Sequence, residues 1–309
     1  MSTKTAIVLL GFNRPQHMGR LLSTLQDNRE FRTIPVLAFV DGPRNREDEE
    51  LISQVVKVVL SVRPDANITR QIENHGVAKS VTTAVTEALT EYEQVIVLED
   101  DLELSSHFLR YMLDGLDAYR GEPKVASIHG YTIPMRGLPH ATYFLRGTDC
   151  WGWGTWRESW GLYRDDSASL LNELINKSLE TDFTFNHASP HLDLLKAAEI
   201  GQVDSWAIRW HASVFLAGGL TLNPSVSLVR NAGMDGSGRH SGTTNLYEST
   251  VSVSPIPVGD IPLAESEKAF RQYQRFYKNR IRRKRRAKAK RKLMLLAKSL
   301  VRKIRSQRS

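Results

Sequence analysis

Short apolar runs alternate with helical patterns through the first 130 residues, and this alternation constrains the fold more than any other feature. The apolar runs predict strands at Ala6–Leu10, Val36–Val40, Ile68–Ile72, Val95–Leu98 and Val125–Ile128. Helices are predicted between and after them, at Gln16–Gln26, Glu47–Val62, Ala78–Tyr92 and Ser106–Tyr119. This rhythm predicts an α/β fold: a doubly wound, mostly parallel sheet with helices on both faces.

The rhythm changes after residue 130. Helices are then predicted at Leu170–Leu179, Leu192–Ile200 and Ser205–Leu216, and a strand at Thr221–Val229. A segment rich in glycine and serine follows at Asn231–Gly242, and residues 243–270 have the irregular pattern of a wrapping segment. We therefore expect residues 1–130 and 131–270 to form two halves of one domain, and residues 271–309 to form a separate tail.

The net charge of +8 hides a division between body and tail. Residues 271–309 contain 18 Lys or Arg and no acid, whereas residues 1–270 hold 24 basic residues against all 34 acidic ones. Apolar side chains recur in the tail at helical spacing: Leu293, Leu296, Leu300 and Ile304. A basic amphipathic helix of this kind is typical of binding to an anionic membrane surface. The alternatives are a solvated, disordered tail or one folded onto the acidic body.

The single cysteine, Cys150, excludes an internal disulfide framework and favours a reducing compartment. The first apolar run, Ala6–Leu10, is too short for a signal peptide, and no apolar stretch reaches the roughly 18 residues of a transmembrane helix. We therefore expect a cytoplasmic protein that associates peripherally with a membrane.

The predicted strand Val95–Leu98 ends in three consecutive carboxylates, Glu99, Asp100 and Asp101. Three adjacent negative charges at a strand end repel one another, and partial burial increases the cost. A bound divalent cation relieves the repulsion, and oxygen ligands favour a hard ion such as Mg²⁺ or Mn²⁺. Ligands of open α/β sheets also bind at the carboxyl ends of strands. The alternative is an acidic turn that caps the helix beginning near Ser105.

Two further segments follow predicted strands. Asp41, in Val40-Asp-Gly-Pro43, either forms a plain turn or accepts the N3–H of a uracil base. His75 and Lys79 lie in the segment that enters the helix predicted at Ala78–Tyr92. Free N–H groups at a helix N-terminus, together with the charge of Lys79, favour a bound phosphate, although first-turn lysines are often just solvated.

In chain order, these segments resemble the nucleotide-sugar half of GT-A fold glycosyltransferases. The resemblance is carried by Asp41, by Asn74-x-Gly76 and by the strand that ends in Glu99-Asp100-Asp101. The run Val97-Leu-Glu-Asp-Asp-Leu-Glu103 is especially similar to the acid motif of N-acetylglucosaminyltransferase I. The likeness is also compatible with the broad family 2 of bacterial glycosyltransferases.

The resemblance continues into the second half and spans residues 5–240 in all. Arg146–Gly154 resembles the family's aromatic, glycine-rich acceptor segment, and Val203–Trp206 lies where the family has Trp-Asp-Asp-Trp. This sequence departs from that motif at Val203 and Ser205. Asn223–Ser227, followed by Gly233–His240, is similar to the family's donor-covering loop.

The resemblance implies a metal-dependent, inverting glycosyltransferase that moves a sugar from a UDP-sugar, such as UDP-GlcNAc, to a glycan or lipid-linked acceptor. Residues 1–130 would be the nucleotide-sugar-binding half and residues 131–270 the acceptor-binding half. Asp101 would bind Mn²⁺ or Mg²⁺. The implied donor-binding residues are Asp41 for the base, Asp100 for the ribose, Glu99 for the donor sugar or the second shell, and Asn74 and Gly76, with Lys79 nearby. The glycine-rich loop Asp235–His240 is either a plain flexible loop or a lid over the bound nucleotide sugar. As a lid, it would bring Arg239 and His240 to the diphosphate, and His240 would complete the metal shell.

On the acceptor side, the resemblance implies that Asp204 is the general base that takes the acceptor hydroxyl proton. The alternative for Asp204 is a helix N-cap, since Ser-Trp-Ala-Ile-Arg follows it. Trp151 and Trp153 are expected to contact the acceptor, because the glycines beside them leave room for a sugar ring. Trp156 and Trp160 are expected to lie in the core.

Two other functions remain open from the sequence. A glycoside hydrolase needs two carboxyls facing each other about 5–9.5 Å apart, whereas adjacent acids at one strand end fit metal binding better. A nucleic-acid-binding protein is suggested only by the basic tail, whose aromatic residues are few, so no specific nucleic acid is expected as a partner.

Overall fold

The computed structural model describes residues 5–138, 140–233, 247 and 249–283. A mixed sheet of eight strands runs through it, and a small sheet of two strands, β5 (Leu102–Leu104) and β10 (Val229–Asn231), lies beside it. The strands of the large sheet are β1 (Thr5–Gly11), β2 (Val36–Val40), β3 (Asn67–Arg70), β4 (Gln94–Glu99), β6 (Val125–His129), β7 (Thr142–Arg146), β8 (Trp153–Trp156) and β9 (Leu220–Pro224).

The strand order in the large sheet is β3-β2-β1-β4-β8-β6-β9-β7. The four strands at one side, β3, β2, β1 and β4, are all parallel. On the other side, β6 and β9 run in the same direction as these four, whereas β8 and β7 run against them. The expected α/β architecture with a mainly parallel sheet is therefore confirmed.

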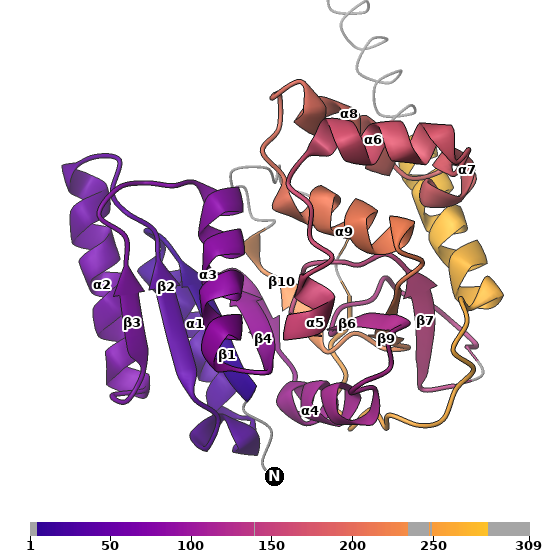
Figure 1. Cartoon of the computed structure of the whole chain (residues 1–309). Coiled ribbons are helices and arrows are strands. Elements are labelled where there is room, and N and C mark those ends of the chain that lie inside the picture. Colours follow the sequence, from indigo (N-terminus) through magenta and orange to yellow (C-terminus); the bar gives the residue numbers. More distant parts are fainter. Residues whose placement is uncertain (1–4, 139, 234–246, 248, 284–309) are drawn as a thin grey trace, which may run out of the picture.

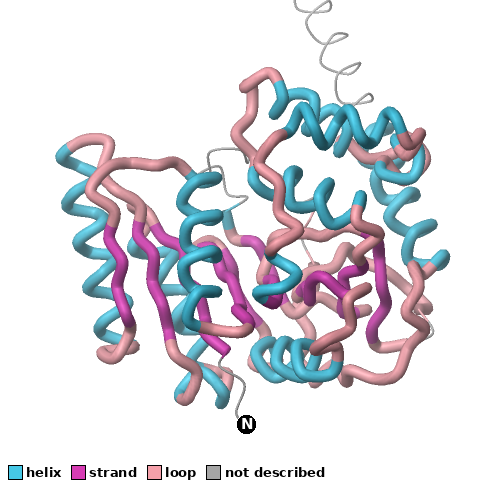
Figure 2. Tube along the Cα trace, in the orientation of Figure 1, coloured by secondary structure: helices cyan, strands magenta, loops and turns pink. Residues whose placement is uncertain are grey.

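Helices cover both faces of this sheet (Figure 2). They are α1 (Pro15–Gln26), α2 (Arg46–Val62), α3 (Val77–Glu91), α4 (Phe108–Ala118), α5 (Arg157–Trp160), α6 (Ser167–Asn176), α7 (Glu180–Phe183), α8 (His191–Glu199) and α9 (Trp206–Leu216), with a 3₁₀ turn at Arg29–Arg32. The side chains of β1 show the two layers. Ile7 and Leu9 pack with α1, α2 and α4, whereas Ala6 and Val8 pack with α3 and α9. A strand buried on both faces explains why β1 reads as a continuous apolar run.

The second half differs from its sequence prediction in two respects. The stretch Thr221–Val229 was expected as one strand, but it forms β9 in the large sheet and β10 in the small one. Strands β7 and β8 were not predicted at all. Both are too short, and β8 too rich in tryptophan and glycine, to show a period of two residues.

The start of the basic tail packs onto the body. A helix begins at Glu267 and continues to Arg283, the last residue described; it is the yellow helix of Figure 1. Ala269 and Tyr273 on this helix are buried, and the Tyr273 ring stacks on Phe185 with centroids 5.6 Å apart. Residues 271–283 therefore belong to the folded body and not to a separate appendage. The amphipathic stripe from Leu293 to Ile304 lies outside the described residues. None of the helices within the described ranges is long and apolar enough to cross a membrane.

Candidate active site

Four neighbouring parallel strands end at one edge of the sheet (Figure 1). Each of them leads into a polar or charged residue of the candidate site. Asn74 follows β3, Asp41 follows β2, Arg14 follows β1, and the acids follow β4. Since neighbouring strands lie about 4.8 Å apart, the three spacings from β3 to β4 cover about 14 Å. The edge therefore offers an elongated polar surface at the place where ligands of open α/β sheets bind.

The acid cluster, defined as Glu99, Asp100 and Asp101, lies at the end of β4. Asp100 is almost fully buried and forms a two-pronged contact with the guanidinium of Arg14, whose Nε donates to Asp100 Oδ2 at 3.3 Å and whose Nη2 donates to Oδ1. The same Nη2 lies 3.6 Å from Asp101 Oδ2. The guanidinium of Arg14 thus contacts two of the three carboxylates, which leaves an excess of negative charge in a largely buried place.

The pKa values of the acid cluster reflect this excess of negative charge and the burial of the carboxylates. Burial raises the pKa of Glu99 to about 8, and repulsion from Asp101 and Asp100 adds to the shift. Burial also raises the pKa of Asp100 to about 6, although Arg14 opposes the change. The pKa of Asp101 is raised for the same reason, against the attraction of Arg14 and His17. Another positive charge at this site would be stabilising.

Asp101, the last residue of the acid cluster, contacts the segment that follows the small sheet. Its backbone carbonyl accepts from Ala232 N–H at 2.7 Å, and Asn231 Nδ2 lies 3.5 Å from Asp101 Oδ1. A Cβ at position 233 would come within 2.5 Å of Asp101 Oδ2, so only glycine fits at Gly233. The first residues of the glycine-rich segment therefore rest directly on this carboxylate.

No group of three or more His, Cys, Asp or Glu side chains within the described residues could by itself hold a metal ion. This arrangement still fits Mn²⁺ or Mg²⁺, because such ions often take only one or two protein carboxylates and complete their shell with phosphate oxygens and water. Arg239 and His240, the other expected contributors, lie outside the described residues.

Asp41 anchors the loop after β3. Its two carboxylate oxygens accept four hydrogen bonds at 2.8–3.0 Å, from the backbone N–H groups of Gly42, His75 and Gly76 and from Asn74 Nδ2. Gly42 permits this packing, because a side chain there would collide with the backbone of Glu73. The carboxylate has about four acceptor positions, so a base N–H has to replace one of these bonds before Asp41 can hold it.

Helix α3 begins beside this loop. Gly76 is its N-cap residue and has a φ of 76°, a conformation that favours glycine. Lys79 lies in the first turn and is exposed. The structure thus places Asn74, Gly76 and Lys79 together at the far end of the sheet edge from the acid cluster.

Strand β8 brings the aromatic segment to the acid cluster. It runs antiparallel to β4 and pairs Trp153 with Val97, so the residues before β8 reach the edge where the acids follow β4. Trp151 is half-buried there, edge-to-face with Tyr131 at 4.6 Å and with Tyr247 at 5.7 Å between ring centroids. Trp151 is therefore positioned as a candidate sugar platform near the acids.

Trp153 requires a correction. Its side chain is fully buried between the sheet and α9, with ring centroids 5.4 Å from Trp206, 5.9 Å from Trp160 and 6.1 Å from Trp210. A ring without exposed surface cannot contact an acceptor, so Trp153 belongs to the core. Trp156 and Trp160 are buried, as expected.

Asp204 precedes α9 but does not cap it, since the Ser205 side chain accepts from Ile208 N–H. The Asp204 side chain is 64% exposed and pairs with Arg209 at 2.9 Å. Arg209 also pairs with Asp165 at 3.0 Å. As arranged here, Asp204 is neutralised by a cation on its own helix.

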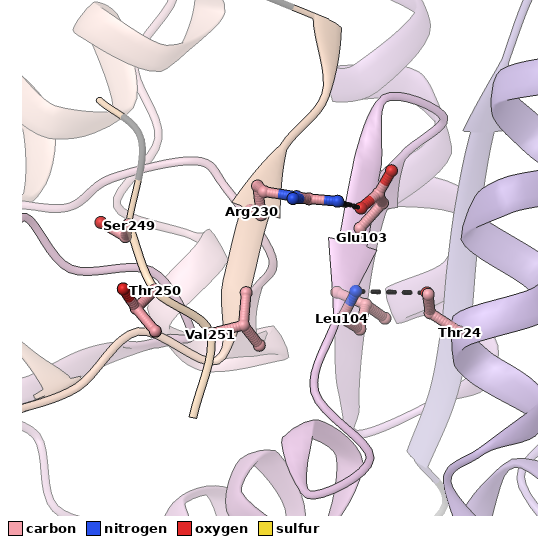
Figure 3. Close-up of a pocket in the computed structure, with 7 residues that line it drawn as sticks. All are labelled: Thr24, Glu103, Leu104, Arg230, Ser249, Thr250 and Val251. Atoms are coloured by element: carbon pink, nitrogen blue, oxygen red, sulfur yellow. Dashed lines mark hydrogen bonds and ion pairs between the residues drawn. The ribbon is translucent and has the colours of Figure 1, made fainter. Parts of the chain in front are cut away.

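A cavity of about 690 Å³ lies beside the small sheet (Figure 3). The cross-strand ion pair between Arg230 and Glu103 borders it. The other lining residues are Thr24, Leu104, Ser249, Thr250 and Val251. None of the acids of the acid cluster lines this cavity, so it is distinct from the sheet edge described above.

Sequence reasoning missed Arg14, the direct partner of Asp100. The available signal was its position, directly after an apolar strand and before Pro15, which starts α1. His129, Tyr131 and Tyr247 were also missed. Tyr247 lies more than 90 residues from Trp151 in the sequence, and only the folded chain brings the two together.

No protein-family model and no curated protein matches this chain. Among solved structures, the mannosyltransferase PcManGT from Pyrobaculum calidifontis, in complex with GDP-Man and Mn²⁺, aligns over 43% of this chain and 36% of its own, with 15% identity and a TM-score of 0.32. S. aureus TarS 1-349 in complex with UDP-GlcNAc aligns over 45% of this chain and 38% of its own, with 19% identity and a TM-score of 0.33. This chain thus spans less than half the length of either structure. Similarity of this extent does not assign a function to the chain.

Proposed function

We propose that this protein is a GT-A type glycosyltransferase that transfers a sugar from a nucleotide donor in a metal-dependent reaction. The observation that carries the proposal is the acid cluster at the end of β4. Three largely buried carboxylates, two of them paired with Arg14, lie on the sheet edge that also holds Asp41 and Asn74. A negatively charged site on a ligand-binding edge is suited to a diphosphate only if a divalent cation joins the two.

The donor would lie along this edge. The base would sit near Asp41 and Asn74 after β2 and β3, beside Gly76 and Lys79 at the N-terminus of α3. The ribose and diphosphate would reach Asp100, Asp101 and Arg14. Glu99 would face the donor sugar.

Asp101 would hold Mn²⁺ or Mg²⁺, with His240 as a second ligand and Arg239 near the diphosphate. When bound, the ion neutralises the charge that grows on the departing diphosphate as the bond to the sugar breaks. Arg14 supplies a fixed positive charge beside the same group. A guanidinium can bind phosphate oxygens with two parallel N–H groups, so Arg14 adds to the stabilisation.

The acceptor would approach from the second half of the chain, with its ring on Trp151. Its hydroxyl needs a carboxylate to take the proton, and Asp204 is the residue that the sequence motif proposes for that role. To act, Asp204 has to release its ion pair with Arg209. A glycan or lipid-linked acceptor remains part of the proposal, as does a cytoplasmic enzyme held at an anionic membrane surface by residues 271–309.

A donor screen tests the proposal directly. Calorimetry with UDP and GDP, each with Mn²⁺, Mg²⁺ or EDTA, should detect nucleotide binding only when a divalent ion is present. Release of UDP or GDP from a panel of nucleotide sugars should show the same dependence. Sugar cleavage from glycosides in EDTA would instead favour a glycoside hydrolase, and the absence of any nucleotide binding would reject the glycosyltransferase.

A further inference from the structure

A second carboxylate of the acceptor half, that of Asp149, lies closer to the acid cluster in the fold than its sequence position suggests. Asp149 precedes β8 by four positions. Because β8 is antiparallel to β4, with Trp153 opposite Val97, the chain before β8 reaches the edge where Glu99 and Asp101 lie. The two segments therefore approach each other from neighbouring strands.

Hydrogen bonds on both sides of Asp149 fix this segment. The Trp151 N–H donates to His129 Nε2 at 3.2 Å, and His129 Nδ1 lies 3.2 Å from Asn223 Oδ1. A neutral His129 with its proton on Nδ1 satisfies both contacts, in accord with the lowering of its pKa by burial. On the other side, His211 Nδ1 donates to the carbonyl oxygen of Thr148 at 2.7 Å and also lies 3.0 Å from the Thr148 backbone nitrogen. Asp149 is thus held between two buried histidines.

The Cys150 thiol is influenced by Asp149 and by the acid cluster. Burial raises the pKa of the Cys150 thiol well above its usual range, and the carboxylate of Asp149 raises it further. Glu99 and Asp101 raise the same pKa. One side chain therefore lies within electrostatic reach of Asp149 and of the acid cluster.

The Asp149 carboxylate is also less engaged than that of Asp204. It is half-buried, it accepts from Cys150 N–H at 2.8 Å, and no cationic side chain within the described ranges forms an ion pair with it. The neighbouring Thr148 Oγ1 is buried and lacks a hydrogen-bond partner in the part of the chain that the structure describes. Thr148 Oγ1 is therefore available to a polar group that enters beside Asp149.

The aromatic side chains around Asp149 suit a sugar. Burial raises the pKa of Tyr247 against the attraction of Arg280, and Asp149 adds to the rise. The Tyr247 ring contacts Trp151. The Tyr131 ring contacts the other side of Trp151. Aromatic faces stack on the C–H faces of sugars, and a carboxylate beside them can accept a hydroxyl proton.

We propose that Asp149, and not Asp204, is the general base that receives the acceptor hydroxyl proton, and that the acceptor is a sugar stacked on Trp151. This inference rests on the proposed glycosyltransferase function. As the acceptor oxygen forms its bond to C1 of the donor sugar, its proton moves to an Asp149 carboxylate oxygen. The bond from C1 to the diphosphate oxygen breaks, its electron pair leaves with the diphosphate, and the anomeric configuration inverts.

The test uses the full chain with Mn²⁺ and the nucleotide sugar that the donor screen selects, with water as the acceptor. Asp149→Asn and Asp149→Ala should bind UDP or GDP with Mn²⁺ as the unmodified protein does, yet hydrolyse the donor about 10²–10⁴-fold more slowly, the usual contribution of a general base. Sodium azide should restore turnover of Asp149→Ala and yield an inverted glycosyl azide, because azide attacks without losing a proton. A purely structural defect would not respond to azide.

Asp193→Asn, which removes an exposed carboxylate on α8, is the matched control and should keep normal turnover. Undiminished hydrolysis by Asp149→Asn, or a loss in Asp149→Ala that azide does not restore, would overturn the role of Asp149. The same holds if azide rescue appears in Asp204→Ala instead. Failure of the unmodified protein to bind any nucleotide is a different result, since it would reject the glycosyltransferase itself.

Discussion

The two halves of the molecule build their contributions to the site in different ways. In the donor half, the site residues follow parallel strands directly, and Asp41 and Asp100 are locked by short hydrogen bonds to neighbouring segments. In the acceptor half, Asp149 and Trp151 lie in an irregular segment between β7 and β8, positioned by contacts to His129, His211 and Tyr247. One half is positioned by sheet register, the other by side-chain packing.

The difference has a physical basis. Parallel strands put their carboxyl ends at one edge, so residues after successive strands meet without any special side-chain contact. A loop has no such constraint, and its conformation depends on which distant residues fill the space around it. Replacing a single charged residue of the donor half should therefore reduce function. Substitutions in the acceptor half should reduce stability as readily as function.

Asp101→Ala should have the largest effect. Without this carboxylate, nucleotide binding in the presence of Mn²⁺ should weaken by about 100-fold or more, because Asp100 is already engaged by Arg14. Calorimetry with UDP or GDP and Mn²⁺ measures the change. Asp114→Ala, which removes a carboxylate paired with Arg110 on α4, is the control and should bind normally. Unchanged affinity in Asp101→Ala would remove this residue from the metal site.

The two tryptophans before and within β8 should separate stability from function. Trp153→Ala leaves a large cavity against α9, so the free energy of unfolding should fall by about 3–5 kcal/mol. Trp151→Ala should cost less, because its side chain is only half-buried. Urea unfolding of both variants gives the comparison. If Trp151→Ala is the more destabilised variant, the assignment of Trp153 to the core and of Trp151 to the sugar platform is wrong.

The acid cluster should make stability depend on pH. The pKa values of Glu99 and Asp100 rise on folding from ordinary values of 4.5 and 3.8 to about 8 and about 6. Their contribution is therefore fully present below these ordinary values and is lost as the pH rises through about 6 and then about 8. In EDTA, the free energy of unfolding should fall between about pH 4 and pH 8 and then level off, and Glu99→Gln should reduce the fall. A rise over this range would contradict the burial of these acids.

Nucleotide and Mn²⁺ should bind more tightly over the same range, since the metal needs the deprotonated carboxylate.

The tail should show the smallest effect on stability. Removing residues 284–309 should leave the free energy of unfolding within about 0.5 kcal/mol, while binding to vesicles that contain phosphatidylserine is lost. A cut before Glu267 should be far more costly, because it removes the buried side chains of Ala269 and Tyr273. Sedimentation with anionic and with neutral vesicles checks the membrane proposal. It fails if the shortened protein still sediments with the anionic vesicles or the intact one never does.

Sequence patterns were sufficient for the first half of the fold. Strand β2 matches its predicted bounds, and β1, β4, α1, α2 and α3 differ from theirs by only one residue at either end. Buried parallel strands and amphipathic helices have periodic signals that depend on local sequence alone. The acids after β4 were found for the same reason, since a charged run after a buried strand is visible without any tertiary contact.

The second half could not be obtained in this way. Trp153 and Trp151 are separated by one glycine, yet the first is fully buried and the second is not. The difference arises from α9, which supplies Trp206 and Trp210 more than 50 residues later. Arg209 lies only five residues after Asp204, but the sequence does not show that the two side chains pair. Long-range packing decides the burial of Trp153, and composition does not record it.

The insertion of β8 between β4 and β6 makes the order of synthesis important. Until Trp153–Trp156 has emerged from the ribosome, β4 is an exposed edge strand of the nascent chain, with a row of unpaired N–H and C=O groups. In an expressed fragment ending at residue 130, β4 would remain an exposed edge strand. We expect such a fragment to self-associate through Gln94–Val97. The donor half is therefore a poor candidate for an independent module, even though it contributes most of the proposed nucleotide-binding surface.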